Sequence, residues 1–211
     1  MRTLGCGRTD AGVHAEEYFA MLELEEDFSI KGLTRGLNTK LPADIVILDA
    51  WETQESFHPL RDVAWKEYIY RFRFGPGLAK DPLVSDFMLT LPYDLRLGNM
   101  MLAAKLFEGE HDFLRYHTTG SEPAGTVRKV LESSIESVEA SSWLPAHYIF
   151  RVRGEGFLKQ MVRLMMGTLF NVGNAKLSLE AIENSFKEGT GHLGAVVPAH
   201  GLALTKVQLK A

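Results

Sequence analysis

The sequence predicts an α+β fold in which helices lie on one side of a mostly antiparallel β-sheet. Strand and helix patterns are mixed along the 211 residues. Residues 63–75 alternate in polarity, which is typical of a strand with two different faces. Residues 156–171 are apolar almost all round, which predicts a buried helix. A hydrophobic share of 45% and a charged share of 24% are normal for a globular protein with a core.

The first part of the chain shows three expected elements. A strand is predicted over 18–24, after the opening loop, and a short helix over 29–42, ended by Asn38 and Pro42. The β-branched run 44–51 is bounded by turn residues and predicts a buried strand. These elements are too few to close a core alone. They therefore either pack on the rest of the protein or lack an N-terminal piece that completes them.

The second part carries the larger set of patterns, and we expect a boundary between domains 1–55 and 56–211. The proline- and glycine-rich stretch 75–92 predicts a long connection. Asp94 is expected to cap one helix and Ser178 another. The remaining expected elements are helices over about 95–108, closed by Gly109, over 156–171 and from Ser178 to Gly189, and strands near 126–138, 147–153 and 201–209.

Composition excludes several classes of protein. The net charge is −4, from 23 basic and 27 acidic residues, which argues against a protein that is basic all over but leaves room for a local basic groove. The single Cys6 excludes an internal disulfide and a cysteine-based zinc cluster, and the histidines lack a metal-site spacing. No signal peptide or dinucleotide fingerprint is recognised, and Lys159 and Arg163 make the most apolar run a poor membrane span.

The opening loop GCGRTDAGVHAEEY, residues 5–18, does not read as a core strand. Its glycines permit a tight turn and the close approach of a ligand, so Asp10 is a candidate functional carboxylate. For an isolated aspartate, an Asx-turn or a helix cap is the commoner role. Arg8 alone would most often be a solvated or salt-bridged surface residue. The group is more specific than either residue by itself.

Two further residues are candidates for chemistry. Tyr68 lies on the alternating strand among basic side chains, where an aromatic ring can stack on a base, although core packing is the commoner role of a strand tyrosine. Arg163 is surrounded by apolar residues, and a buried guanidinium without a partner is very costly. Either its head reaches water, or it pairs with a carboxylate in a cleft.

The sequence resembles the TruA family of tRNA pseudouridine synthases, in five motifs that follow one another in the family's order. The opening loop matches the family signature, and the other four motifs extend the match over nearly the whole chain. The matching segments are GRTDAGVHA (7–15), FHPLRDVAWKEYIYRF (57–72), AAKLFEGEHDFLRY (103–116), GEGFLKQMVRLMMGTLFNVG (154–173) and PAHGLALTKVQL (198–209).

The resemblance implies a fold, a reaction and partners. The fold would be two RRM-like (ferredoxin-like) halves joined in a mostly antiparallel sheet. The reaction would convert uridine to pseudouridine at positions 38–40 of the tRNA anticodon arm, by breaking the N-glycosidic bond, rotating the uracil and rejoining it through C5. Such enzymes need no metal and no cofactor, and they act as homodimers on tRNA. The expected location is the cytoplasm, with no contact with a membrane.

The resemblance also implies residue roles. Asp10 matches the catalytic aspartate, and Arg163 matches the arginine that pairs with it. Tyr68 matches the tyrosine that stacks on the target base and acts as a base late in the reaction. Arg8 matches the residue that helps hold the target base out of its stack, and Leu202 matches an apolar residue that lines the uracil pocket. A guanidinium beside a carboxylate nucleophile favours its charged form and aims it.

Two departures from the family pattern keep alternatives open. Family members begin with a strand and a helix before the signature loop, so the N-terminal half is expected to be truncated and to lack a central strand. This favours, as the second hypothesis, a non-catalytic tRNA-binding protein of the same fold; an unrelated aspartate-based hydrolase is a third. The chain is also acidic overall, so its RNA groove would need a specific set of cations: Arg8, Arg61, Lys66, Arg151, Arg153, Lys159 and Arg163.

Overall fold

The computed structural model describes residues 2–24, 28–118 and 125–210. The chain divides into two units, each of which gathers segments that are separate in the sequence. The smaller unit consists of residues 1–7 and 19–62, and the larger of residues 8–18 and 63–211. Residues 8–18 of the opening loop, which include Asp10, thus belong to the same unit as residues 63–211.

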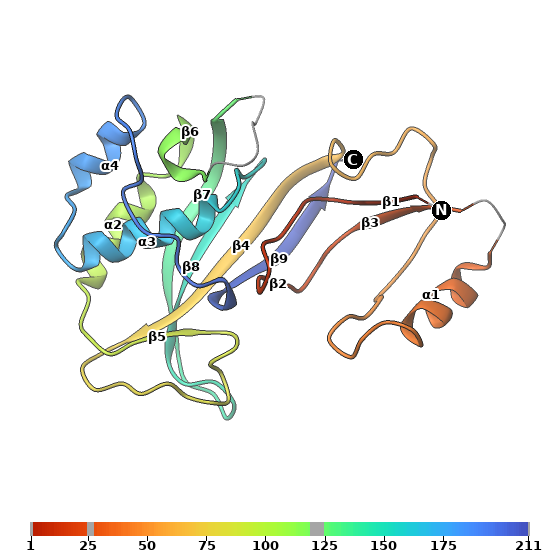
Figure 1. The fold of residues 1–211 in the computed structure, drawn as a ribbon, viewed down its shortest axis with the longest axis horizontal. Helices are drawn as coiled ribbons and strands as arrows, with labels where there is room; N and C mark the ends of the chain where they lie inside the picture. The colour runs from red at the N-terminus through yellow and green to blue at the C-terminus, as the bar shows by residue number, and fades with distance from the viewer. Residues whose placement is uncertain (1, 25–27, 119–124, 211) are drawn as a thin grey trace. The chain divides into compact units, whose positions relative to one another are not determined.

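The smaller unit contains a two-stranded antiparallel sheet and one helix (Figure 1). Strands β1 (Arg2–Gly5) and β3 (Ala20–Glu23) pair along their full lengths. Helix α1 (Ile30–Asn38) begins after Ser29, whose hydroxyl accepts a hydrogen bond from the Gly32 N–H at 3.2 Å. This is the usual way to satisfy a free amide at a helix N-terminus. The predicted strand at 18–24 and the predicted helix at 29–42 are therefore both confirmed.

The buried strand predicted over 44–51 is wrong. These residues form no strand, and their large apolar side chains are exposed, with Val46 at 64% and Leu48 at 76%. The side-chain amide of Asn38 takes the place of a neighbouring strand. It accepts a hydrogen bond from the Ile47 N–H at 2.7 Å and donates one to the Ile47 carbonyl at 3.0 Å. A β-branched run becomes a core strand only when neighbours pair its backbone and cover its face.

The larger unit is built on a seven-stranded sheet. The order of its strands is β2-β9-β4-β8-β7-β6, with β5 added beside β4. All the pairs are antiparallel except β2 with β9 and β4 with β5. The strands are β2 (His14–Ala15), β4 (Val63–Phe74), β5 (Leu89–Leu91), β6 (Gly109–Asp112), β7 (Val127–Val138), β8 (His147–Gly154) and β9 (Leu202–Leu209).

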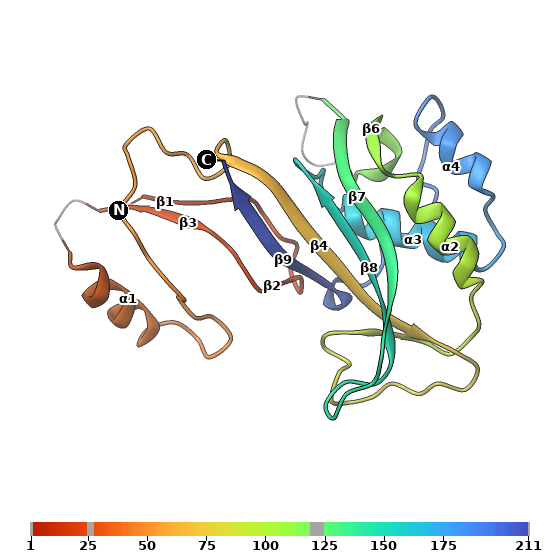
Figure 2. The same cartoon turned by 180° about the vertical axis from the view of Figure 1, so that it is seen from behind.

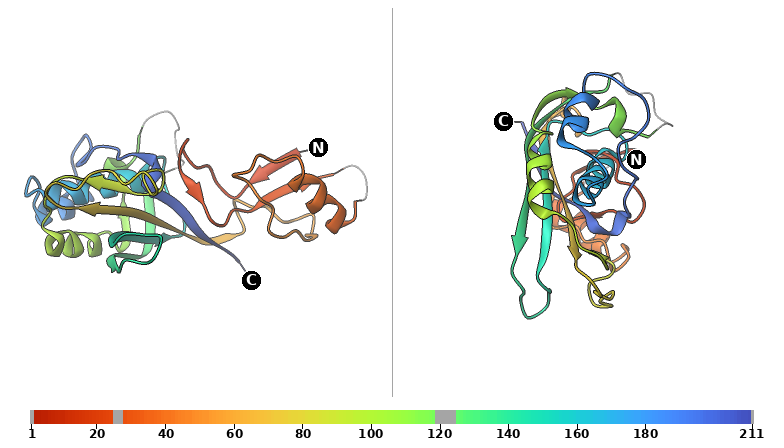
Figure 3. Two further views of the ribbon diagram at one scale, coloured as in Figure 1. Left: turned by 90° about the horizontal axis from the view of Figure 1, so that it is seen from below. Right: turned by 90° about the vertical axis from the view of Figure 1, so that its left-hand side faces the viewer.

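The helices of the larger unit, α2 (Leu97–Lys105), α3 (Met161–Gly173) and α4 (Leu179–Ser185), lie on one face of the sheet (Figures 2 and 3). Short 3₁₀ turns, η1 (Leu114–Tyr116) and η2 (Ala199–Gly201), complete the unit. The mostly antiparallel α+β architecture with helices on one side is confirmed.

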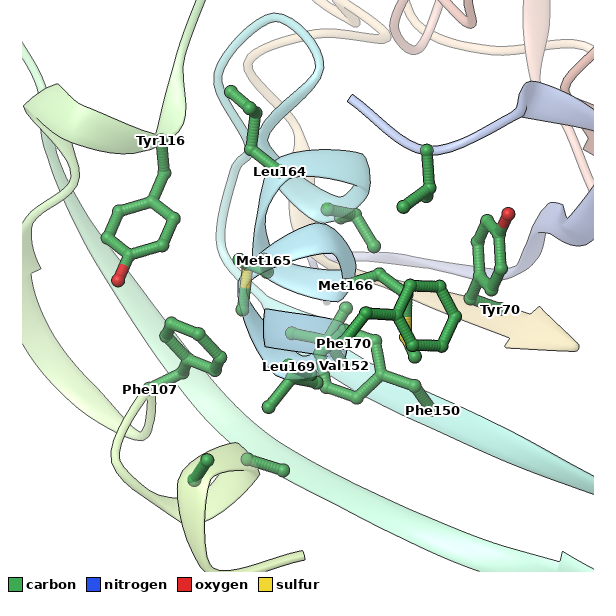
Figure 4. Close-up of a cluster of buried hydrophobic side chains, with 14 of the residues drawn as sticks. Tyr70, Phe107, Tyr116, Phe150, Val152, Leu164, Met165, Met166, Leu169 and Phe170 are labelled. Atoms are coloured by element: carbon green, nitrogen blue, oxygen red, sulfur yellow. The ribbon is translucent and has the colours of Figure 1, made fainter. Parts of the chain in front are cut away.

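Helix α3 runs through the centre of the core and is buried almost all round (Figure 4). Tyr70 and Phe150 from the sheet and Phe107 from the α2 side pack around it. The segment after α4 crosses α3 very closely: a Cβ added at Gly167 would lie 1.9 Å from the Ala195 carbonyl oxygen. The expected burial of this helix is confirmed, and glycine is needed at that crossing.

Two boundaries differ from expectation. Helix α3 begins at Met161 rather than at 156, because Gln160 has a left-handed backbone with φ of 60° that cannot continue a right-handed helix. Helix α2 begins after Arg96, with no side-chain cap, so Asp94 does not cap it. Ser178 does cap α4, accepting a hydrogen bond from the Ala181 N–H at 3.2 Å.

A search for membrane spans and for metal clusters gives negative results within the described residues. There, no helix combines the length and the apolarity needed to cross a bilayer. Over the same ranges, no three His, Cys, Asp or Glu side chains gather in a way that could hold a metal ion.

Candidate active site

An ion pair joins the opening loop to the central helix. The Nη1 of Arg163 donates to Oδ2 of Asp10 at 2.6 Å, although 153 positions separate the two residues in the sequence. The side chain of Arg163 is 13% exposed and that of Asp10 is 28% exposed. The contact is thus partly shielded yet open on the aspartate side. Of the two sequence-based interpretations of Arg163, the structure favours the pair with a carboxylate.

The Arg163 guanidinium is held at a second point. Its Nε donates to the carbonyl of Val197 at 2.7 Å, in the segment that leads into η2. Two hydrogen bonds from one planar guanidinium fix its orientation as well as its position. The charge therefore reaches Asp10 in one direction, on a helix that the core holds rigidly.

The opening loop places Asp10 through a tight turn. The Val13 N–H donates to the Asp10 carbonyl at 3.1 Å, and Gly12 has φ of +80°. Glycine is favoured at this third position because a type II turn requires positive φ there. The structure thus gives Gly12 a role in the backbone of the turn, in addition to any contact with a ligand.

The residues after the turn anchor the loop to the last strand. Strand β2 pairs in parallel with β9, so that His14 lies opposite Ala203. The Glu16 N–H donates to the Leu204 carbonyl at 2.8 Å, and the Glu17 carboxylate accepts from the Val207 N–H at 2.9 Å. The two glutamates therefore help to hold the opening loop on the sheet.

Tyr70 is a residue of this site that the sequence analysis did not select. Its hydroxyl donates to the Pro198 carbonyl at 2.9 Å, next to the Val197 carbonyl that Arg163 holds. Burial raises the pKa of Tyr70 above its usual value, and the nearby positive charge of Arg163 opposes that effect only in part. A Cβ on Gly201 would lie 2.7 Å from the Tyr70 ring, so glycine makes room for it. In the sequence, the sign that Tyr70 belongs to the site was its position two residues after Tyr68, on the same face of the strand.

Tyr68 and Leu202 lie on the same face of the sheet. Tyr68 is half-buried and packs edge-on against Phe157, with ring centres 5.1 Å apart. Leu202 is 5% exposed and lies opposite Tyr70 on the neighbouring strand. Leu202 is therefore linked to the site through Tyr70, and Tyr68 through the strand that it shares with Tyr70.

Arg8 lies two residues before Asp10 and is exposed. Among the described residues, its side chain has no hydrogen-bond or ion-pair partner, so the structure does not bring it to the Asp10–Arg163 pair. Its guanidinium is available for a ligand that approaches the loop.

The expected basic groove is not formed by Arg151 and Arg153. Both lie on the sheet face opposite the helices, where each donates to the Glu67 carboxylate at 2.9 Å. Arg151 also pairs with Glu136 at 3.1 Å. Burial pushes the pKa of Glu67 up, but hydrogen bonds from Arg153 and Thr205 and the two arginine charges outweigh it and leave that pKa lowered. These cations are neutralised within the protein.

Arg61, a further member of the expected groove, belongs to the smaller unit. Its Nε contacts the carboxylate of Asp62 at 3.3 Å, and its Nη2 donates to the Ser56 carbonyl. This local engagement is typical of a surface arginine.

Comparison with known proteins identifies the family. The family described as tRNA pseudouridine synthase matches residues 103–209. Over 210 residues the chain is 35% identical to tRNA pseudouridine synthase A 1 of Desulfotalea psychrophila, covering 96% of this chain and 81% of that relative. It is 36% identical to tRNA pseudouridine synthase A of Solibacter usitatus, with 97% and 80% covered, and 31% identical to that of Streptococcus uberis, with 96% and 79% covered.

These identities extend over most of both partners in each comparison, rather than over a single motif. The family match alone includes Arg163 and Leu202, and the relatives align with nearly the whole chain. They confirm the resemblance that the five ordered motifs indicate. The chain belongs to the tRNA pseudouridine synthase family.

Proposed function

We propose that this protein is an isomerase that converts uridine to pseudouridine at positions 38–40 of the tRNA anticodon arm, with Asp10 as the nucleophile. The single observation that carries the proposal is the 2.6 Å pair between Asp10 and Arg163, found in a member of the tRNA pseudouridine synthase family. The choice of the anticodon arm as the site of modification rests on the resemblance of the five sequence motifs to the TruA family.

The reaction is an isomerisation, so no atom is gained or lost overall. The bond between N1 of uracil and C1′ of the ribose breaks, and a bond between C5 and C1′ forms. C5 loses its proton and N1 ends with one. A carboxylate can act as the covalent nucleophile in such a sequence. The free Oδ1 of Asp10, which accepts no hydrogen bond from a described residue, is the oxygen available for this step.

The other residues position the base and the nucleophile. Arg163 holds Oδ2 of Asp10 and keeps the carboxylate aimed. Tyr68 offers an aromatic face to the uracil and removes the C5 proton late in the reaction, and Leu202 lines the base pocket. Arg8 occupies the space that the base leaves in the stem. Extracting a base costs roughly a few kcal/mol, which stacking on Tyr68 and contacts with Arg8 partly offset.

The test uses unmodified tRNA tritiated at uridine C5. Formation of pseudouridine releases the tritium to water, and sequencing of the treated tRNA locates the modified positions. We expect release by the wild-type protein, and none above background by Asp10→Asn. The matched control is Asp94→Asn, an exposed aspartate at the start of the α2 segment, which should behave as wild type. Full activity of Asp10→Asn would refute the assignment.

The second candidate is a tRNA-binding protein of the same fold without catalysis. Apolar side chains of the smaller unit, such as Leu48 and Trp51, are exposed. This exposure favours a protein that uses this surface to bind a partner. Tight tRNA binding without tritium release would support this candidate. We also propose that the protein acts in the cytoplasm as a homodimer, and light scattering of the purified protein tests the latter point.

A further inference from the structure

The larger unit contains a pocket, with Arg115 in its lining, that the proposed catalytic residues do not use. Its volume is about 440 Å³, and it is formed by residues 114, 115, 117 and 118, at and after η1, and by residues 189–192, after α4. We propose that this pocket binds a backbone phosphate of the RNA substrate, an inference that rests on the proposed function.

The charge of the pocket fits an anion. Arg115, His117 and His192 line it, together with two threonines, and none of its described lining residues is acidic. This is notable in a chain whose acidic residues outnumber the basic ones, 27 to 23. Guanidinium, imidazole and hydroxyl groups are the side chains that bind phosphate oxygens in proteins.

Arg115 is oriented but not neutralised. Its Nε donates to the Gly191 carbonyl at 2.9 Å, and its own carbonyl is 3.0 Å from Nδ1 of His192. Its remaining guanidinium nitrogens meet no carboxylate among the described residues. This differs from Arg151 and Arg153, whose charges are taken up by Glu67. An arginine fixed at Nε with free Nη groups is prepared for a bidentate contact with a phosphate.

Glycine gives the guanidinium its space. Gly189 has φ of +105°, and a Cβ at that position would lie 2.7 Å from Nη1 of Arg115. Any larger residue would therefore be strained and would also press on the guanidinium. The backbone of 189–191 forms a wall that holds Arg115 from one side.

The other wall retains unused hydrogen-bonding capacity. Nδ1 of His117 and Oγ1 of Thr118 are buried and find no hydrogen-bond partner within the described ranges. An unpaired buried polar atom costs about 1–3 kcal/mol. Both residues line the pocket, so a phosphate beside Arg115 would accept hydrogen bonds from them once their side chains rotate toward it.

The pocket lies at the same end of α3 as the proposed catalytic pair. The Thr118 N–H donates to the Lys159 carbonyl at 3.3 Å, two residues before α3 begins at Met161, and Arg163 lies in the first turn of that helix. The wall formed by residues 189–192 continues along the chain to Val197, whose carbonyl binds Arg163. A single RNA strand that presents a uridine to Asp10 therefore has neighbouring phosphates within the same region of the unit.

The first experiment measures how tRNA affinity depends on salt. In Arg115→Gln we expect the Kd for tRNA to rise about tenfold, and the slope of log Kd against log salt concentration to fall by about 0.7–0.9, as for one lost phosphate contact. Arg115→Lys keeps the charge and should recover most of the slope. An unchanged slope in Arg115→Gln would overturn the proposal.

The matched control is Arg96→Gln. Arg96 is exposed and lies at the opposite end of α3, where its backbone N–H donates to the Gly173 carbonyl at 2.9 Å. We expect wild-type affinity and slope. An equal loss in both variants would mean that any surface cation matters equally, and would also overturn the proposal. Circular dichroism of each variant identifies one that has failed to fold; in that case the NMR titration of the wild-type protein carries the test.

A second experiment does not depend on catalysis. The imidazole NMR signals of His117 and His192 are followed while uridylyl-uridine, a phosphodiester, or inorganic phosphate is added. Saturable shifts with the phosphodiester that vanish in Arg115→Gln would support the proposal. Shifts with inorganic phosphate alone, with no change in the tRNA salt slope, would assign the pocket to free phosphate instead. If both arms succeed but wild-type protein releases no tritium, the pocket stands and the proposed reaction fails.

Discussion

Two arginine–carboxylate contacts lie on opposite faces of the same sheet, and they differ in how completely the carboxylate is used. Glu67 is 6% exposed, and its two oxygens accept from Arg151, Arg153 and Thr205. Asp10 is held by Arg163 at Oδ2, and its Oδ1 has no partner among the described residues. A fully bonded carboxylate stabilises a fold, whereas a carboxylate with one oxygen left over is able to react.

The largest expected effect is on the rate of tritium release, which should depend on the Asp10–Arg163 contact and not on the Glu67 contacts. Asp10→Asn keeps the shape of the side chain but removes the nucleophile, so the rate of tritium release should fall at least about a thousandfold. Its free energy of unfolding, measured in urea, should fall by about 1–2 kcal/mol, because the mostly buried Arg163 loses its counter-ion although the asparagine oxygen can still accept its hydrogen bond. A variant that unfolded instead would show that Asp10, like Glu67, is mainly structural.

The converse substitution, Glu67→Gln, should lower stability. It leaves two arginine charges without their buried counter-ion, which we expect to cost about 2 kcal/mol once partial exposure of the arginines is allowed for. Urea unfolding measures the loss. Tritium release per folded molecule should stay near the wild-type rate; a large loss of activity at normal stability would mean that this face of the sheet contacts RNA.

A smaller effect follows from pH. The pKa of Glu67 is lowered in the folded protein, because the arginine and threonine contacts outweigh its burial. Its contribution is therefore fully present above the unfolded-state pKa, near 4.3, and is lost as pH falls through the lower folded-state pKa. The stability difference between wild type and Glu67→Gln should shrink between pH 6 and pH 3. A difference that grew on acidification would contradict this assignment.

The smallest effect concerns Tyr70, which stands beside the reactive pair. Tyr70→Phe removes the hydrogen bond to the Pro198 carbonyl and should lower the free energy of unfolding by about 1 kcal/mol. Because the segment 197–198 also positions Arg163, we expect a modest fall in the rate of tritium release. Tyr148→Phe, on strand β8 of the same sheet, is the control, since no side-chain hydrogen bond of Tyr148 occurs among the described residues.

The sequence was informative where a residue differed in polarity from its neighbours. A guanidinium at Arg163, within an apolar helix, needs either water or a carboxylate partner; the family resemblance pointed to Asp10, and the structure places the two in contact. The strand over 63–75 was equally clear, because two faces of different polarity repeat through it. These features depend on local pattern and on the high cost of burying a charge.

Features that depend on distant neighbours were not predictable in the same way. Arg151 and Arg153 carry the composition of an RNA groove, but the alternation of β8 turns them toward Glu67 on the far face. The run 44–51 has the composition of a core strand, but no strand pairs with it, and the Asn38 side chain binds the backbone N–H and carbonyl of Ile47 instead. In both cases the same local pattern is compatible with two outcomes, and only tertiary packing selects between them.

The parallel pairing of β2 with β9 has a consequence for the timing of protein synthesis. Because translation runs from the N-terminus, His14 is made well before its partner Ala203. Asp10 therefore remains unplaced on the nascent chain, even after the central helix has been made, until the final strand closes over it. A prematurely terminated polypeptide that lacks β9 would carry Asp10 but not the strand that holds the opening loop in place.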